Sequence, residues 1–422
     1  MTMKIAIIGA GSSYTPEIIE ELVKLKERLP VTRLSFMDPD EKRLEIMAGF
    51  CRRFMEHLGH KIEIEATTDR RRAIEGSRFV LTQIRVGGNA QRVLDEKIPL
   101  KYGVIGQETT GPGGMLKALR TIPAILEIAH EVEAIAPEAW IINYTNPTGL
   151  VAEAVNKYTK VTITGLCAGA YFPRNAVMHA LGVPESSIYY DYFGLNHLNY
   201  GYNIRVDGQL LNDEEWEKIA HVATWGSVNA ELIRLMRVIP SPYLQYFFHH
   251  AQCVSQARAK ELTRGETVQK IEEEVFRAYA DPAQHTKPEA LSKRGGGGYS
   301  EIALSVMEAV YNNQDRIIII NTPNRGAVTG MPEEAVLEIP CLVNASGIFP
   351  LRQPVVPRVM WGLISSVKTY EQYTVEAAVT GSRATALLAL MSHPLVGEYE
   401  LAVPLLDEML TANKAFLPQF FG

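Results

Sequence analysis

The chain has 422 residues, of which 46% are hydrophobic and 21% are charged, as is usual for globular proteins. This length exceeds what one ordinary core accommodates, so we expect two closely packed domains. The formal net charge of -6 lacks the basic excess that nucleic acids and anionic membranes attract, so neither is an expected partner.

Neither a leader nor a membrane-spanning segment is expected. The first apolar run begins at Lys4, which leaves no room for a cleavable leader, and no apolar run reaches the roughly 18 residues that a bilayer requires. The cysteines lie far apart and lack zinc-type spacing, at Cys51, Cys167, Cys253 and Cys341. We therefore expect four free thiols and a cytoplasmic protein.

Strands and helices alternate in the first part of the chain. Lys4–Ile8 is a short apolar run that ends in a glycine turn, and apolar residues then recur at helical spacing from Ile18 to Val23. Further strands are predicted over 33–37, 78–84, 140–143 and 161–166, with a helix over about 116–135. This alternation predicts a parallel α/β sheet of the Rossmann type, and ligands bind such sheets at the carboxyl ends of the strands.

The character of the sequence changes beyond about residue 190. The segments 200–206 and 336–343 resemble antiparallel strands, and long helices are predicted over 213–236, 256–279 and 356–391. The glycine run 295–298 is too short for a linker and suggests close backbone approach to a ligand or to a neighbouring segment. We predict a cofactor domain over 1–190 and an α+β substrate and oligomerisation domain over 191–422, like the C-terminal half of lactate and malate dehydrogenases.

A dinucleotide site is predicted at the first glycine turn. Gly9 and Gly11 follow a strand and open a helix, so they permit a tight turn while the helix N-terminus offers amide donors to a pyrophosphate. Ser12 and Ser13 add hydroxyl donors. Tyr14 stands where the third glycine of the usual fingerprint would be, which makes this a variant of that motif.

Asp38, at the end of the second strand, is the expected partner of the adenosine ribose, and an acidic residue there favours NAD over NADP. The alternative is that Asp38, together with Pro39 and Asp40, makes a turn and caps the helix that begins at Glu41. Both roles are compatible with the sequence.

A metal site is suggested by Cys167, at the end of one strand, and by His197, which follows another aromatic segment. A thiolate and an imidazole at the same sheet edge would begin a divalent transition-metal site with open positions. On spacing alone the pair is a weak signal, because a single histidine is more often a hydrogen-bonded structural residue.

Longer motifs strengthen this interpretation. They are Gly9-Ala10-Gly11-Ser12-Ser13-Tyr14-Thr15-Pro16, Gly106-Gln107-Glu108-Thr109, Asn143-Tyr144-Thr145-Asn146-Pro147, Gly165-Leu166-Cys167, Gly194-Leu195-Asn196-His197 and Pro242-Tyr243-Leu244. Together they resemble glycoside hydrolase family 4, the NAD- and manganese-dependent glycosidases, and within it the 6-phospho-β-glucosidases. The resemblance covers essentially the whole chain.

The resemblance implies an oxidation and elimination mechanism, which sets this family apart from glycosidases with two carboxylates. NAD⁺ removes hydride from C3 of the sugar, a base removes the acidified C2 proton, and the glycosidic oxygen is expelled. Cys167 and His197 would hold the metal, and Tyr243 would be the base. Because a phenol has a pKa near about 10, we expect a metal or cation to lower the pKa of Tyr243.

The remaining site residues follow from the same resemblance. Asn146 would bind a sugar hydroxyl, although an Asx turn before proline is the plainer interpretation. Glu108 would orient metal-bound water or assist protonation, with helix capping as the alternative. Ser13, Arg92 and Arg264 would contact a substrate phosphate, since arginine suits oxyanions. Relatives of this kind imply a homodimer or homotetramer.

One segment departs from the family pattern. Cys167 is followed by Ala168-Gly169-Ala170, where the family usually has a polar side chain that varies with the substrate. This loop cannot bind the sugar or donate a proton through side chains, so the same chemistry on an unphosphorylated or different glycoside stays open. An NAD-dependent 2-hydroxy-acid dehydrogenase and a non-catalytic NAD sensor are the alternatives from other classes, since fold alone does not separate them.

Overall fold

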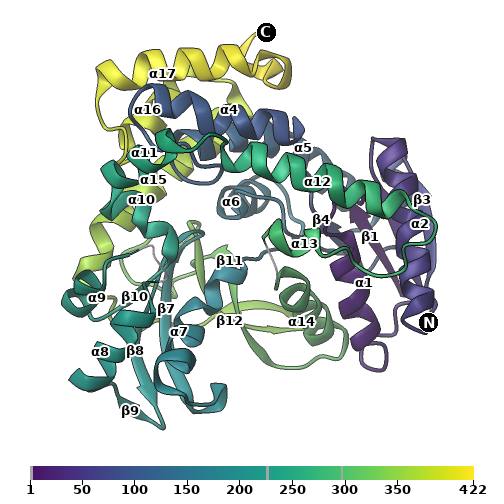
Figure 1. Cartoon of the computed structure of the whole chain (residues 1–422), viewed down its shortest axis with the longest axis horizontal. Helices are drawn as coiled ribbons and strands as arrows, with labels where there is room; N and C mark the ends of the chain where they lie inside the picture. Colours follow the sequence, from purple (N-terminus) through teal and green to yellow (C-terminus); the bar gives the residue numbers. More distant parts are fainter. Residues whose placement is uncertain (1–2, 225–227, 296–297) are drawn as a thin grey trace.

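The computed structural model of the chain describes residues 3–224, 228–295 and 298–422 (Figure 1). Six parallel strands form its first half: β1 (Lys4–Ile8), β2 (Arg33–Met37), β3 (Glu63–Thr67), β4 (Phe79–Thr82), β5 (Trp140–Asn143) and β6 (Ile163–Gly165). They are ordered β3-β2-β1-β4-β5-β6. This order reverses direction between β1 and β4, and that switch point is where a doubly wound sheet opens a crevice for ligands.

Antiparallel strands continue the same sheet: β7 (Ile188–Leu195), β8 (Leu198–Val206), β9 (Gln209–Leu210), β10 (Ile239–Pro240), β11 (Arg316–Pro323), β12 (Val336–Asn344) and β13 (Gly347–Pro350). The two halves join where β11 pairs antiparallel with β6. The predicted α/β class is confirmed. The boundary placed after residue 190 falls within β7, and dividing the chain there stays a prediction.

The first half of the chain contains the helices α1 (Thr15–Lys24), α2 (Glu41–His57), α3 (Arg70–Ile74), α4 (Gly88–Lys101), α5 (Gly111–Ile135), α6 (Thr148–Tyr158) and α7 (Phe172–Leu181), the last of which packs on β7 of the antiparallel region. In the second half lie α8 (Asp213–Val222), α9 (Ala230–Met236), α10 (Gln245–Phe248), α11 (His250–Ala259), α12 (Arg264–Ala280), α13 (Ala290–Lys293), α14 (Tyr299–Tyr311), α15 (Arg358–Thr380), α16 (Arg383–Ser392) and α17 (Tyr399–Ala412). One large apolar cluster extends through both halves. In the part of the chain described, no helix is long and apolar enough to cross a bilayer.

Each of the three long helices predicted for the second half is divided in two. The prediction over 256–279 spans the end of α11 and most of α12, because Thr263 starts a new helix by accepting a hydrogen bond from the Glu266 amide. Gly381, with φ +69°, ends α15, and Ser382 caps α16. The prediction over 213–236 becomes α8 and α9, with residues 225–227 outside the described part of the chain.

Helix α12 links the two halves above the sheet. Figure 1 shows it in green, running from the C-terminal helices towards α2, and it packs on both α4 and α2. A residue midway along α12 is thereby held over the region where β1 and β4 end. Four free cysteines, all buried, are present as expected.

Candidate active site

A cavity of about 1200 Å³ lies at the carboxyl ends of β1 and β4 and is lined by residues from both halves of the chain. Ligand pockets usually measure about 300–1,000 Å³, so this one has room for a dinucleotide and a second small molecule. The predicted site residues that line it are Gly9, Gly11, Ser12, Asp38, Arg92, Glu108, Asn146, His197, Tyr243 and Arg264. Ser13 and Cys167 are buried.

The glycine turn after β1 is shaped by close backbone approach. Gly9 has φ +89°, and a Cβ there would lie 2.9 Å from the Gln83 main-chain oxygen after β4. A Cβ on Gly11 would lie 2.7 Å from Asp38 Oδ2, which accepts a hydrogen bond from the Gly11 amide at 2.9 Å. The turn is therefore a cradle that only glycine fits, as a dinucleotide site requires.

Asp38 makes a turn and also faces the cavity. Its Oδ1 accepts a hydrogen bond from the Asp40 amide at 3.0 Å, while burial raises the pKa of its carboxyl. Asp40 is the residue that caps α2, through the Arg43 amide at 3.0 Å. Both interpretations of this segment thus have a structural basis, and the ribose contact stays a prediction for Asp38.

Replacing Gly11 by alanine is expected to weaken NAD⁺ binding by about tenfold or more, because fitting a methyl group into a packed site costs about 1–3 kcal/mol. The added Cβ would push the Asp38 carboxylate away from the ribose position. The dissociation constant for NAD⁺, measured by titration calorimetry, checks this. Gly362→Ala is the matched control, since a Cβ at Gly362 would meet nothing within 4 Å. Equal affinity in Gly11→Ala and the wild type would remove this turn from the cofactor site.

His197 is held as a neutral imidazole at the cavity wall. It lies in the β7–β8 turn with φ +65°, and its Nδ1 is 2.7 Å from Thr109 Oγ1, which leaves Nε2 available. Burial lowers its pKa to about 3. A neutral histidine with one ring nitrogen fixed by a hydrogen bond is the usual form of a metal ligand. The left-handed backbone of a non-glycine residue is a strain that functional sites commonly hold.

Cys167 and Asn146 meet through a side chain that the sequence did not single out. The Tyr299 hydroxyl forms hydrogen bonds with both, and burial raises the pKa of the Cys167 thiol to about 12. Asn146 Oδ1 is buried without a hydrogen-bond partner. Within the described residues no three His, Cys, Asp or Glu side chains converge, so a metal here would need this amide oxygen as well as the thiolate and imidazole. A thiolate, an imidazole and an amide oxygen form a mixed donor set for a divalent transition metal with open positions.

Tyr243 stacks on His197, with ring centroids 3.8 Å apart and an interplanar angle of 4°. Burial raises its pKa above the usual value, and the nearby Cys167 also raises it. Arg92 is the cation that acts in the expected direction, but burial and the anionic neighbours outweigh it. Arg92 is thus a cation of the expected kind, but it does not bring the pKa of this phenol below its usual value, and lowering by a bound metal stays a prediction.

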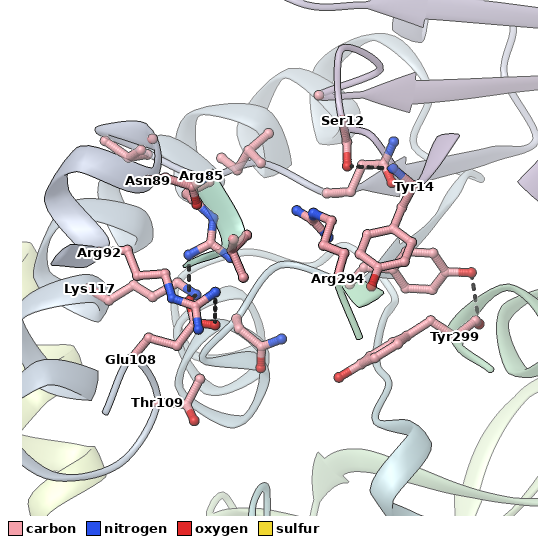
Figure 2. A pocket seen from close by; sticks show the side chains of 18 of the residues that line it. Ser12, Tyr14, Arg85, Asn89, Arg92, Glu108, Thr109, Lys117, Arg294 and Tyr299 are labelled. Carbon is pink, nitrogen blue, oxygen red and sulfur yellow. Dashed lines mark hydrogen bonds and ion pairs between the residues drawn. The ribbon is translucent and has the colours of Figure 1, made fainter. Parts of the chain in front are cut away.

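Glu108 is surrounded by three cations on one side of the cavity (Figure 2). Arg85 is paired with it directly, Lys117 Nζ lies 2.7 Å from its Oε2 and Arg92 Nη1 lies 3.1 Å from its Oε1. Burial alone would raise the pKa of Glu108, but these cations hold it well below the usual value. A carboxylate that stays ionised does not donate a proton, which leaves orientation as its candidate role. Helix capping does not apply, because α5 has no side-chain cap.

The residues predicted to contact a phosphate are not gathered at one point. Arg92 pairs with Glu96 at 2.8 Å and with Glu108. Arg264 donates to the main-chain oxygens of Lys293 and Arg294, at 3.2 and 2.7 Å, and so braces the backbone there. Ser13 Oγ instead points to Glu272 on α12, at 3.0 Å.

Two further donors face Glu272. They are Asn89 Nδ2, at 2.9 Å, and Arg294, whose Nε and Nη2 lie 3.1 and 3.0 Å from Oε1. We call Ser13, Asn89 and Arg294 with Glu272 the anion corner. Both donors that the sequence reasoning missed adjoin glycine runs, Asn89 after Gly88 and Arg294 before Gly295, a signal that was available. The middle of the second run, residues 296–297, lies outside the described part of the chain.

Comparisons with known proteins give matches along the whole chain. Residues 4–183 match the sequence model of family 4 glycosyl hydrolases, and residues 192–396 match that of the family's C-terminal domain. A probable 6-phospho-beta-glucosidase of Bacillus subtilis is 40% identical over 434 aligned positions, which cover 100% of this chain and 98% of that protein.

Solved structures of similar chains carry ligands. The 6-phospho-beta glucosidase of Thermotoga maritima with NAD and glucose-6-phosphate has a TM-score of 0.91 and 34% identity, and covers 98% of this chain and 99% of its own. Another structure of that enzyme, with manganese, NAD+ and glucose-6-phosphate, has a TM-score of 0.89 and 33% identity over the same shares. Malate dehydrogenase of Plasmodium falciparum, at 13% identity and a TM-score of 0.55 over 90% of this chain and 99% of its own, shows a common fold only.

Proposed function

This chain belongs to family 4 of the glycosyl hydrolases, and on that premise we propose that it hydrolyses 6-phospho-β-glucosides with NAD⁺ and a divalent metal, Mn²⁺, as cofactors. The observation that carries the proposal is one cavity lined by a glycine cradle, His197, Asn146, a phenol and most of an anion corner. Cys167 is buried and is connected to Asn146 through Tyr299. The β configuration and the 6-phosphate follow the relatives at 34–40% identity, which carry that activity in their names. The dehydrogenase and sensor alternatives are set aside.

The two cofactors supply what the side chains lack. When bound, NAD⁺ provides the hydride acceptor for C3 of the sugar and Mn²⁺ provides the positive charge that stabilises the enediolate. Cys167, His197 and Asn146 would hold the metal, and Gly9, Gly11, Ser12 and Asp38 the dinucleotide. These assignments rest on the donor chemistry and the shape of the cavity.

The chain's own residues perform the proton transfer and the positioning. Tyr243 would accept the C2 proton at its phenol oxygen, with its ring held flat against His197. Glu108, fixed by three cations, would orient water near the glycosidic bond. The anion corner would hold the 6-phosphate, and Arg264 would fix the position of Arg294 by donating to its main-chain oxygen.

A panel of aryl glycosides, phosphorylated and not, of α and β configuration, tests this function. With Mn²⁺, NAD⁺ and a thiol reductant, we expect aglycone release from the β-glucoside 6-phosphate with no net rise in NADH absorbance, because the hydride returns to C3. Hydrolysis that continued undiminished after metal and NAD⁺ were stripped would rule out the proposed chemistry. Stoichiometric NADH would restore the dehydrogenase hypothesis.

The same chemistry on an unphosphorylated or different glycoside is the second candidate. Two observations favour it: the Ala168-Gly169-Ala170 loop brings no polar side chain to the sugar, and Glu272 already occupies the donors of the anion corner. Turnover of the unphosphorylated β-glucoside in the panel above, at a kcat/KM equal to that of the phosphorylated one, would establish this candidate.

We further propose a cytoplasmic homodimer or homotetramer. Four buried thiols are free, as expected for a protein kept in a reducing compartment. Ile317 on β11 and Phe349 on β13 are exposed and flank Leu342 of β12 on either side in the sheet, where a second copy would cover them. Light scattering coupled to size exclusion measures the oligomeric state directly.

A further inference from the structure

Glu272 is a largely buried carboxylate at the edge of the active-site cavity. Its side chain is only 14% exposed, and it accepts hydrogen bonds from Ser13, Asn89 and Arg294. Arg43 Nη2 lies 3.8 Å away. Three donors from separate parts of the chain therefore converge on one carboxylate, in the arrangement that a phosphate group would require.

The corner is fixed in place from several sides. Arg294 stacks on the Tyr14 ring, with its guanidinium carbon 4.2 Å from the ring centroid, and Arg264 holds the main chain at residues 293 and 294. Arg294, Arg43 and Ser13 keep the pKa of Glu272 below its usual value in spite of burial. Glu272 is therefore a carboxylate whose charge the corner is built to balance.

We propose that Glu272 competes with the phosphate of the substrate for Ser13, Asn89 and Arg294, and thereby sets how strongly the enzyme prefers phosphorylated over unphosphorylated glycosides. A dianionic phosphate cannot share these donors with an ionised carboxylate without repulsion, so Glu272 must turn away when the phosphate binds. This inference rests on the proposed function. Glu272 would oppose the binding of phosphate, whereas the donors of the anion corner favour it.

The phosphate could come from the sugar or from the pyrophosphate of the dinucleotide. The corner opens towards the catalytic side of the cavity, because Asn89 lies one helical turn before Arg92, which reaches Glu108. Figure 2 shows Arg294 between Tyr14 and the Asn89 and Arg85 side chains. These positions favour the sugar phosphate.

The test measures the dissociation constants of glucose 6-phosphate, glucose and NAD⁺ for the wild type, Glu272→Gln and Glu273→Gln. Glutamine keeps the size of Glu272 and removes its charge. We expect Glu272→Gln to bind glucose 6-phosphate about tenfold more tightly, because the like-charge repulsion is gone, and to bind glucose unchanged. Glu273→Gln removes the same charge from an exposed position on α12 and is expected to match the wild type.

The outcomes separate this inference from the proposed function. Unchanged or weaker binding of glucose 6-phosphate by a folded Glu272→Gln, while the wild type binds it, overturns the inference and leaves the function standing. Binding by Glu272→Gln alone supports the inference and removes phosphorylated sugars as substrates of the wild type. Tighter binding of NAD⁺ alone overturns the assignment to the sugar phosphate, and absence of glucose 6-phosphate binding in all three proteins overturns both ideas. Circular dichroism verifies that each variant is folded.

Discussion

Replacing Tyr243 by phenylalanine is expected to lower kcat by about 10²- to 10⁴-fold, the usual contribution of a general base, with little change in KM. Phenylalanine keeps the ring that stacks on His197 at 3.8 Å, so the fold and the metal donors should be undisturbed. Only the hydroxyl that would accept the C2 proton is lost. Rates on the aryl β-glucoside 6-phosphate with saturating Mn²⁺ and NAD⁺ measure the effect.

Exchange of a C2 deuterium with solvent measures removal of the C2 proton separately from the other steps of the reaction. The exchange should slow in Tyr243→Phe by the same factor as kcat, because both depend on removal of the C2 proton. Tyr246 is the competing phenol, since it lines the same cavity with its ring 6.1 Å from that of Tyr243. Should Tyr246→Phe lose the exchange while Tyr243→Phe keeps it, the two assignments would have to be reversed.

Features set by local sequence were predictable. The apolar run of β1, the glycines after it and Asp38 at the end of β2 lie within one βαβ unit, whose geometry follows from strand and helix periodicity. The strands β1, β2, β5 and β12 were predicted to within a residue. The long helices were not, because an apolar period continues across Thr263 and Ser382 although each of these residues starts a new helix.

Features set by tertiary contact were not predictable. Ser13 and Glu272 are 259 positions apart, and nothing local to either indicates that they share a hydrogen bond. Tyr299 likewise reaches Cys167 only through the placement of α14, which packs on α1 and β12. Resemblance to a family placed Arg92 and Arg264 at a phosphate, and that contact stays a prediction. The sequence did not indicate that Arg92 pairs with Glu108 or that Arg264 donates to main-chain oxygens. Charge partners in a buried site depend on packing, which a single sequence does not display.

Replacing Glu108 by glutamine is expected to destabilise the folded chain by about 3–5 kcal/mol, because removing one partner of a buried ion cluster leaves the others uncompensated. Arg85, Arg92 and Lys117 would then face one another across an uncharged amide, with Lys117 only 4% exposed. Even with Glu108 in place, burial and the neighbouring Arg85 lower the pKa of Lys117 to about 7, which shows how little additional positive charge the cluster tolerates.

Urea unfolding of Glu108→Gln and of two further variants tests whether the unpaired cations cause the loss of stability. Glu63→Gln breaks an exposed pair, in which Arg33 Nη2 lies 3.0 Å from Glu63 Oε2 and the two side chains are 47% and 60% exposed, and is expected to cost at most about 1 kcal/mol. Adding Lys117→Met to Glu108→Gln removes one of the unpaired cations and should restore part of the lost stability. If Glu108→Gln lost no more stability than Glu63→Gln, solvation by water rather than pairing with Glu108 would be stabilising the three cations, and the buried ion cluster would not depend on this carboxylate.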